Sequence, residues 1–516
     1  MTTTFLQSFK VTRIPMTKPS ILPLFIVAVV VGDFALNTYG IRFPYYWHPD
    51  EIGKVDQVRS GIYNFYHPQL MIQLARFARE VTGAADTVRD TMISGRLVSA
   101  AATAIAVASF ATIVARQFGI VFGALTAVLL AITPSVFLNA HYFKEDASLL
   151  MGVALTMLCI QNITANSSTR NLVLLALALG ITISAKYVGV FMVVPVIAIL
   201  IHRVRALQIV YCLVLAASVF LLVNGAGIFG RSSLTAGLIY ELKHVTTSHG
   251  GVEWGPTSSG ALKMFMGSAP LLTICLWLTG VGMLVSKWLR PQRTSGTAFS
   301  FECILFLTPI VLLIVNQLSM IIAPRYFLVA TVLATVGAIW TAASVFSSKT
   351  LPAARYAPII LIVIAGASTA WSFAAVADVF RNDPRSELAA WIANNLPKNA
   401  RIAQDFYSGL PTPDRAARDP AIVTLPQSIT MAHFHMGAAG SVAALQAQGY
   451  THMVISSGGF DRFYDPAATL DARANDQKEF FDKVFKTMKP VHEVPRKSNV
   501  DPILSSRILV YDLRNN

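Results

Sequence analysis

Long apolar runs recur through roughly the first 380 residues of the chain, and short polar stretches separate them. A helix needs about 20 mostly apolar residues to cross a hydrocarbon core about 30 Å thick. Runs of this kind predict eleven membrane-spanning helices, over about residues 20–39, 91–115, 120–138, 147–163, 171–185, 188–202, 206–228, 264–286, 300–320, 325–346 and 354–377. The fifth and sixth runs are short, and one long tilted helix over residues 171–202 is the alternative.

After the last apolar run the pattern becomes that of a water-soluble domain. Short apolar strands alternate there with helical patterns, the strands at 401–405, 451–456 and 508–512 and the helices at 385–395 and 478–488. This alternation is typical of a small α/β domain. We therefore expect a polytopic α-helical membrane protein, residues 1–379, followed by a soluble α/β domain, residues 380–516.

The charge of the chain supports this division. The 516 residues are 54% hydrophobic and carry a formal net charge of +14. A basic chain can indicate nucleic-acid binding, but here the excess charge lies in short loops between apolar runs, where it is a topology signal. Nucleic acid is therefore not an expected partner.

The basic loops also predict an orientation. Arg116, Arg170, Arg203 and Lys287 fall on one side of the membrane if residues 171–202 form two spans. The positive-inside rule makes that side, and the N-terminus, cytoplasmic. The C-terminal domain and most acids of the membrane part then face outside. We expect a bacterial inner or plasma membrane protein.

Two external segments are long. In the first, residues 40–90, apolar residues at helical spacing (Leu70, Leu74, Phe77 and Val81) predict an amphipathic helix in the interface. The second, residues 229–263, is rich in Gly, Ser and Thr. It is either a mobile lid or an ordinary connecting loop.

Two adjacent carboxylates, Asp50 and Glu51, follow the first span. Acids after Pro49 are typical of a solvated first helical turn. Carboxylates delivered to a membrane surface also frequently mark function. Position alone leaves both interpretations open.

Cations embedded in apolar context lie at the predicted external edge. Arg96 begins the second span, Lys186 lies between the fifth and sixth, and Arg325 begins the tenth. Lys144, Glu145 and Asp146 lie between the third and fourth. Each alone is usually structural, but together they indicate a site for an anionic ligand such as a lipid phosphate. Such cations would neutralise a departing phosphate, while a carboxylate deprotonates an attacking hydroxyl.

The order of these motifs resembles the GT-C superfamily glycosyltransferases of family 39, the protein O-mannosyltransferase and aminoarabinose transferase type. The resemblance rests on Asp50-Glu51, His67-Pro68-Gln69-Leu70, Gly95-Arg96-Leu97, Tyr142-Phe143-Lys144-Glu145-Asp146, Ala185-Lys186-Tyr187-Val188-Gly189 and Pro324-Arg325-Tyr326. The family loop usually reads His-Pro-Pro-Leu, so Gln69 departs from it. The C-terminal domain resembles those of bacterial members through Val454-Ile455-Ser456-Ser457-Gly458.

The resemblance implies a membrane glycosyltransferase that moves a hexose or pentose from a polyprenyl-phosphate donor to a hydroxyl acceptor (glycan, lipid or protein) on the extracytoplasmic face. It implies Asp50 as catalytic base, with Glu51 supporting it or orienting the acceptor. Arg96 would hold the acidic pair or the donor. The other substrate-binding residues implied are Lys186 and Arg325 for the lipid phosphate, Glu145 or Asp146 for sugar or acceptor, and Lys144, His67, His141, Tyr187 and Tyr326.

Two alternatives remain at this stage. A transporter or lipid flippase with an external lipid-phosphate site would share the cations, although no internal repeat is visible. A divalent cation, Mg or Mn, would suit ligands drawn from His48, Asp146, His244 and His249. Lys186 and Arg325 would make such a metal unnecessary.

Overall fold

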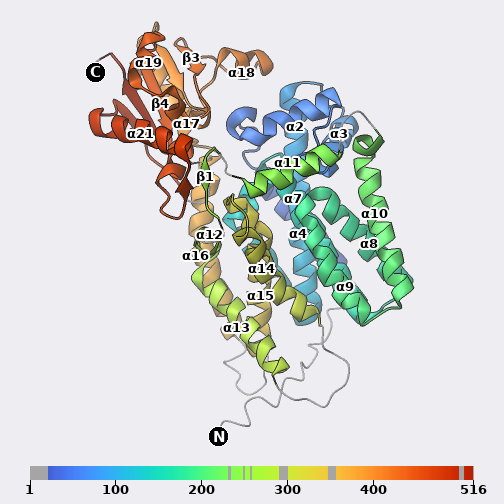
Figure 1. Cartoon of the computed structure of the whole chain (residues 1–516). Helices are drawn as coiled ribbons and strands as arrows, with labels where there is room; N and C mark the ends of the chain where they lie inside the picture. The colour runs from blue at the N-terminus through green and yellow to red at the C-terminus, as the bar shows by residue number, and fades with distance from the viewer. Residues whose placement is uncertain are drawn as a thin grey trace.

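The computed structural model describes residues 21–229, 234–247, 250–255, 259–289, 300–346, 356–498 and 505–514. It consists of a membrane part, residues 21–379, which is a bundle of helices, and a C-terminal segment, residues 384–514, built around a sheet (Figure 1). The long helices of the membrane part are α1 (Ile21–Asn37), α4 (Val88–Phe118), α5 (Ile120–Ala131), α6 (Pro134–His141), α7 (Glu145–Ala165), α8 (Thr169–Ala185), α9 (Val193–Ile201), α10 (Ala206–Phe229), α13 (Leu271–Trp288), α14 (Phe301–Gln317), α15 (Leu328–Phe346) and α16 (Ala357–Val379).

Six helices in the described part of the chain are long and apolar enough to cross a membrane. The count is seven if α5 and α6, which meet at an angle of 62°, form one broken span. Four shorter apolar helices, at Ile21–Asn37, Thr169–Ala185, Tyr187–Ile201 and Phe301–Gln317, coincide with further predicted spans. The chain is thus a mostly helical protein with six or seven clear spans, and the total of eleven stays a prediction.

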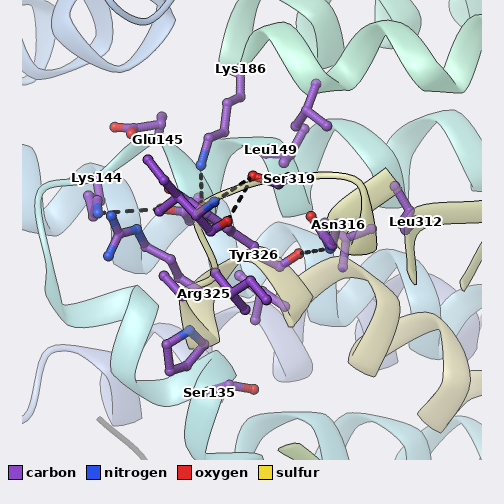
Figure 2. A pocket seen from close by; sticks show the side chains of 18 of the residues that line it. Ser135, Lys144, Glu145, Leu149, Lys186, Leu312, Asn316, Ser319, Arg325 and Tyr326 are labelled. Atoms are coloured by element: carbon purple, nitrogen blue, oxygen red, sulfur yellow. Dashed lines mark hydrogen bonds and ion pairs between the residues drawn. The ribbon is translucent and has the colours of Figure 1, made fainter. Parts of the chain in front are cut away.

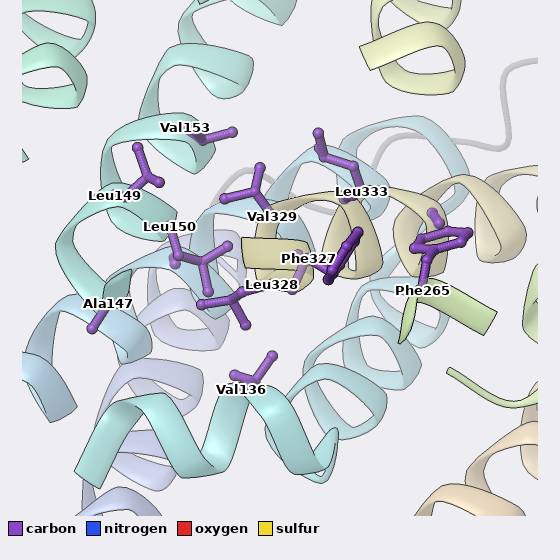
Figure 3. Packing of buried hydrophobic residues seen from close by; sticks show 14 of the residues in the cluster. Val136, Ala147, Leu149, Leu150, Val153, Phe265, Phe327, Leu328, Val329 and Leu333 are labelled. Atoms are coloured by element: carbon purple, nitrogen blue, oxygen red, sulfur yellow. The ribbon is translucent and has the colours of Figure 1, made fainter. Parts of the chain in front are cut away.

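Helix α4 is the centre of the bundle, where it packs against α1, α3, α5 and α7. Small side chains permit this close packing. A Cβ on Gly123 of α5 would lie 2.6 Å from the Cβ of Ala115 on α4. Close backbone approach at small residues is the usual packing mode of membrane helices, because lipid provides no hydrophobic drive to bring them together. Branched side chains of α6, α7 and α15, among them Val136, Leu150 and Leu328, fill the space beside them (Figure 3).

At one end of the bundle, the short helices α2 (Pro49–Ser60), α3 (Leu70–Thr82) and α11 (Leu234–Thr246) lie across the long ones (Figure 1). A further short helix, α12 (Gly260–Ser268), precedes α13 in the chain. The first half of α3 is buried against α4, whereas Phe77 and Val81 in its second half are 63% and 68% exposed. Among the described residues of the segment 229–263, α11 and the start of α12 are helical.

The C-terminal segment contains a five-stranded sheet in the order β3-β2-β4-β7-β6. Its strands are β2 (Arg401–Gln404), β3 (Ser428–Met431), β4 (His452–Ser456), β6 (His492–Val494) and β7 (Ile508–Asp512). Strand β2 pairs in parallel with β3 and β4, and β7 is antiparallel to β4 and β6. Helix α17 (Pro384–Asn395) buries Leu388 and Ile392 in a core with Ile402, Val454 and Val510. Shorter helices α18 (Pro413–Arg418), α19 (Val442–Ala447) and α20 (Ser457–Phe460) and the longer α21 (Ala472–Thr487) complete the segment.

The two parts are joined by a second, two-stranded sheet. Strand β1 (Val252–Glu253) of the membrane part pairs antiparallel with β5 (Thr469–Leu470) of the C-terminal segment. Beside it, Trp254 Nε1 donates a hydrogen bond of 2.7 Å to Asp465 Oδ2. The stretch at residues 252–254 is therefore attached to the C-terminal segment.

Candidate active site

A cavity of about 1800 Å³ lies where the short helices, the bundle and the C-terminal segment meet. Its polar end is lined by Asp50, Lys144 and Arg325. From there it continues between α7, α9 and α14 as an apolar groove, along Leu149 and Leu312. The cavity therefore combines a charged head region with a groove of membrane-like character.

Asp50 lies in the first turn of α2. The His48 ring caps this helix, because its Nδ1 accepts a hydrogen bond of 3.2 Å from the Asp50 N–H. Pro49 occupies the first helical position, where its missing N–H is not needed. The Asp50 side chain is 37% exposed, and its contact with solvent is through the cavity.

Two cations hold the Asp50 carboxylate. Lys144 Nζ lies 2.5 Å from Asp50 Oδ2, and Arg325 Nη2 lies 4.0 Å from the same oxygen. Burial alone would raise the pKa of Asp50, but the attraction of Lys144 and Arg325 outweighs it and holds the pKa well below its ordinary value. Asp50 is therefore ionised at neutral pH.

A second carboxylate, Asp146, connects two of the cations. Lys186 Nζ lies 2.8 Å from Asp146 Oδ1, and Lys144 Nζ lies 3.9 Å from Asp146 Oδ2. Figure 2 shows the ends of Lys144, Lys186 and Arg325 converging from three separate elements. The Tyr326 ring lies 5.3 Å from Lys186 Nζ and 5.2 Å from the Arg325 guanidinium carbon, within cation–π range.

A third carboxylate, Glu145, binds residues of the first external segment. Lys54 Nζ lies 2.8 Å from Glu145 Oε2, and His67 Nε2 lies 2.9 Å from Glu145 Oε1. His67 Nδ1 in turn lies 3.4 Å from Glu241 Oε1 on α11. Burial opposes the charge on Lys54, but Glu145 and Asp50 raise its pKa above the ordinary value. The ammonium therefore stays charged inside the protein.

Tyr187 lines the cavity and also fixes its wall. Its hydroxyl donates a hydrogen bond of 2.9 Å to the Phe65 carbonyl. Phe65 has a φ of +54°, a left-handed conformation that a bulky residue adopts only under constraint. The Tyr187 hydrogen bond therefore meets the backbone where the chain has this constrained conformation.

Glu51 and Arg96 lie outside the cavity and pair with each other, and holding the acidic pair is one of the two roles that the resemblance implies for Arg96. Both side chains are fully buried and pair in a bidentate manner, Nε to Oε1 at 2.8 Å and Nη2 to Oε2 at 2.6 Å. Arg96 Nη1 also donates to the carbonyls of Ile41 and Phe43 at 2.8 and 2.6 Å. Neither residue lines the cavity.

The Glu51–Arg96 pair fastens three segments around the site. Glu51 Oε1 accepts a hydrogen bond of 2.8 Å from the Phe143 N–H. A Cβ on Gly95 would lie 2.3 Å from the Phe143 ring, so glycine permits this approach. Asp50 directly precedes Glu51 and Lys144 directly follows Phe143, so the Glu51–Phe143 hydrogen bond brings Asp50 and Lys144 together at the cavity.

The predicted histidines are dispersed. His141 is buried with its ring nitrogens 2.7 and 2.8 Å from the carbonyls of Phe137 and Tyr39, and it does not line the cavity. Burial and Lys144 lower the pKa of His48 well below its ordinary value, so its ring is neutral. His244 lines the cavity, and His249 lies outside the described residues. Among the described residues, no group of three or more His, Cys, Asp or Glu side chains is placed to hold a metal ion.

Sequence patterns missed several cavity residues. Lys54 follows Asp50 by four residues, so both lie on one face of α2, and this spacing is a signal that could have found it. Glu241 lies on α11, a helix that was not predicted. Tyr407 and Arg462 come from the C-terminal segment, and no local signal connects them to Asp50.

The geometry defines a class of protein: a helical membrane protein with a cavity that combines an ionised carboxylate, several cations and an apolar groove. The sequence profile of the family described as dolichyl-phosphate-mannose-protein mannosyltransferase matches residues 82–242 of the chain. The match spans less than half of the chain, but it includes Arg96, Lys144, Glu145, Asp146 and Lys186. It confirms the family resemblance predicted from the short motifs. None of the curated proteins compared with the chain matches it.

Three solved structures have backbone folds similar to that of this chain. ArnT from Cupriavidus metallidurans bound to undecaprenyl phosphate shares 15% identity, with 96% of this chain and 98% of that chain covered and a TM-score of 0.49. The archaeal oligosaccharyltransferase AglB from Archaeoglobus fulgidus shares 9% identity, with 92% and 80% covered and a TM-score of 0.46. The S. cerevisiae protein O-mannosyltransferase Pmt1-Pmt2 complex shares 20% identity, with 48% and 37% covered and a TM-score of 0.33. Likeness at these scores is too loose to assign an activity.

Proposed function

We propose that the protein is a membrane glycosyltransferase, which transfers a sugar from a polyprenyl-phosphate donor to a hydroxyl acceptor. One observation carries the proposal: the ionised Asp50 carboxylate lies beside Lys144 and Arg325 at the head of an apolar groove. The matched family takes its description from a sugar on dolichyl phosphate, which is a donor of this class.

The donor fits the cavity in one orientation. Its prenyl chain occupies the apolar groove along Leu149 and Leu312, because burial of each CH₂ group is favourable by about 0.8 kcal/mol. Its phosphate then meets Lys186 and Arg325 at the groove's head. Arg325 lies 4.0 Å from Asp50, a loose contact that leaves its donors available to phosphate oxygens.

The reaction is a displacement at the anomeric carbon. Asp50 takes the proton of the acceptor hydroxyl, and the acceptor oxygen forms a bond to the anomeric carbon. The bond from that carbon to the phosphate oxygen breaks, and its electron pair leaves with the polyprenyl phosphate, where Lys186 and Arg325 neutralise it. The sugar configuration inverts, and the proton ends on Asp50.

Donor binding also improves Asp50 as a base. In the empty site, cations depress its pKa and make it a weak base. A phosphate that occupies Lys186 and Arg325 compensates their charge and raises the pKa of Asp50 toward that of an effective base. Asp50 is therefore most basic when the donor is present.

The remaining roles follow from position. Glu51 and Arg96 act as positioning residues, whereas Glu145, Asp146 and His67 shape the sugar's surroundings.

We place residues 1–379 in a bacterial inner membrane with eleven spans and a cytoplasmic N-terminus, and residues 380–516 as a soluble domain outside the cell membrane. The site then opens to the extracytoplasmic face. No metal is needed for the step.

The test is transfer by purified protein in lipid nanodiscs, with radiolabelled undecaprenyl-phosphate mannose and arabinose as donors and native membranes as acceptor. Asp50→Asn should reduce transfer about 100-fold or more, the usual contribution of a general base, while donor binding remains. Asp476→Asn is the matched control, because Asp476 is an exposed aspartate of α21 outside the cavity. Equal transfer by Asp50→Asn would refute the base. Movement of the lipid across the bilayer without product would indicate a flippase.

A further inference from the structure

The C-terminal segment supplies part of the cavity wall. Tyr407, Phe434, Gly458 and Arg462 line the same cavity as Asp50, although they lie more than 350 residues further along the chain. The apolar groove is lined by membrane helices, among them α7 and α14. None of these four residues belongs to the helices that line the groove.

The contact between Tyr407 and the strand end of β4 is close. A Cβ on Gly458 would lie 3.1 Å from Tyr407 Cβ and 2.9 Å from Ser506 Oγ, so only glycine fits there without displacement. Burial raises the pKa of Tyr407, and Arg462 opposes this shift. The Ser456-Ser457-Gly458 motif thus packs against a phenol that lines the same cavity as the proposed base.

Arg462 carries a charge that the protein does not neutralise. Its Nη2 donates long hydrogen bonds to Tyr407 Oη at 3.3 Å and to the Gly458 carbonyl at 3.4 Å. No carboxylate in the described part of the chain forms an ion pair with it, and its Nε has no partner there. The neighbouring Arg496, in contrast, pairs with Asp461 and with Ser457 Oγ. An unneutralised guanidinium at a cavity wall favours an anionic ligand.

We infer that Tyr407 and Arg462 form the acceptor subsite, and that the acceptor carries an anionic group, a phosphate or a carboxylate, near its reactive hydroxyl. The inference rests on the proposed function. The acceptor approaches Asp50 from the aqueous end, opposite the leaving phosphate, as in-line displacement requires. Arg462 holds the acceptor's anion, and Tyr407 offers its hydroxyl and ring to the acceptor next to Asp50.

The experiment separates transfer to acceptor from transfer to water. Full-length protein in nanodiscs receives radiolabelled undecaprenyl-phosphate mannose or arabinose, with and without native membranes. Arg462→Gln should raise the KM for membrane acceptor at least tenfold, while slow hydrolysis of the donor and its binding stay as in wild type. Arg462→Lys should recover part of the transfer. Arg473→Gln is the matched control, because Arg473 is an exposed arginine of the same segment.

Competitors identify the anion. Mannose 6-phosphate and glucuronate present the two candidate charges, and mannose presents none. Inhibition of wild type by one charged sugar, with weaker inhibition of Arg462→Gln, supports the subsite and names its group. An unchanged KM in Arg462→Gln, or equal inhibition by mannose, would overturn it. Loss of both hydrolysis and transfer in wild type would instead contradict the proposed glycosyltransferase.

Discussion

The environment of Asp50 sets the pH at which the site works. Lys144 contacts the carboxylate at 2.5 Å, and its own pKa is lowered by burial and by Arg325. A base must be deprotonated to act, so activity is lost as pH falls through the pKa of Asp50. Because that pKa lies well below the ordinary value in the empty protein, the acid limb for the free enzyme lies at low pH.

Replacement of Lys144 tests this balance. Lys144→Gln removes the closest cation while burial persists, so the pKa of Asp50 rises and the acid limb of kcat/KM moves to higher pH. The pH profile of kcat/KM measures the shift, and Lys144→Arg, which keeps the charge, should restore most of it. An acid limb at the wild-type pH in Lys144→Gln would mean that another group controls it.

The sequence alone could not show which of the two neighbouring acids, Asp50 or Glu51, reaches the cavity. Neighbouring helical residues point in directions about 100° apart, and which one meets the cavity depends on the packing of α2 against α4. Asp50, Lys144, Lys186 and Arg325 were grouped from their places at span ends, and the structure brings them together. Arg96 also donates to the carbonyls of Ile41 and Phe43, and no sequence pattern predicts these contacts.

Helix α11 closes one side of the cavity. Gly237 lies against the strained backbone of Phe65, where a Cβ would be 2.0 Å from the Phe65 carbonyl oxygen. Beside this contact, the rings of Tyr66 and Tyr240 stack with centroids 3.8 Å apart. Together with the His67–Glu241 contact, these interactions hold α11 over the head region.

Gly237→Ala should therefore displace α11. Forced overpacking against backbone usually costs about 1–3 kcal/mol, so we expect faster amide hydrogen exchange in residues 234–246 and a higher KM for the donor. Gly32→Ala is the control, because a Cβ on Gly32 of α1 meets nothing within 4 Å. Exchange in α11 that matches this control would show that the contact does not hold the helix.

At the element scale, helices and strands could be predicted where their sequence pattern lies within the element itself. Apolar length is a local property, so helices lie in all the predicted spans that the structure describes. The strands β2, β4 and β7 likewise fall within predicted strand segments. Helix α11 was missed because its flanks are rich in Gly and Ser, and its contacts with Phe65 and Tyr66 join residues far apart in sequence.

At the scale of the whole molecule, the C-terminal segment is held to the membrane part at several points. The β1–β5 pairing and the Trp254–Asp465 hydrogen bond lie on one side. On another, Arg385 Nη1 donates to the Trp47 carbonyl at 2.9 Å, and Arg418 pairs with Asp56 on α2. This arrangement gives the cavity a fixed wall, which supports a shared site.

Trp254→Phe tests the importance of this attachment. The substitution keeps most of the apolar ring but removes the donor to Asp465, so residues 461–470 should exchange amide hydrogens faster and transfer to acceptor should fall severalfold. Donor binding should be retained. Trp371→Phe on α16 is the control, since Trp371 is 84% exposed. Unaltered exchange and transfer in Trp254→Phe would show that the other contacts suffice.

The buried Glu51–Arg96 pair complicates any mutational screen of this chain. Breaking such a pair usually destabilises a protein by about 3–5 kcal/mol, because one charge is left buried alone. A screen that scores only product would therefore rank Glu51 and Arg96 beside Asp50, as apparent catalytic residues. A parallel measurement of the amount of folded protein would separate loss of catalysis, expected at Asp50, from loss of folded protein, expected at Glu51 and Arg96. The distinction divides even Asp50 and Glu51, which are neighbours in the chain.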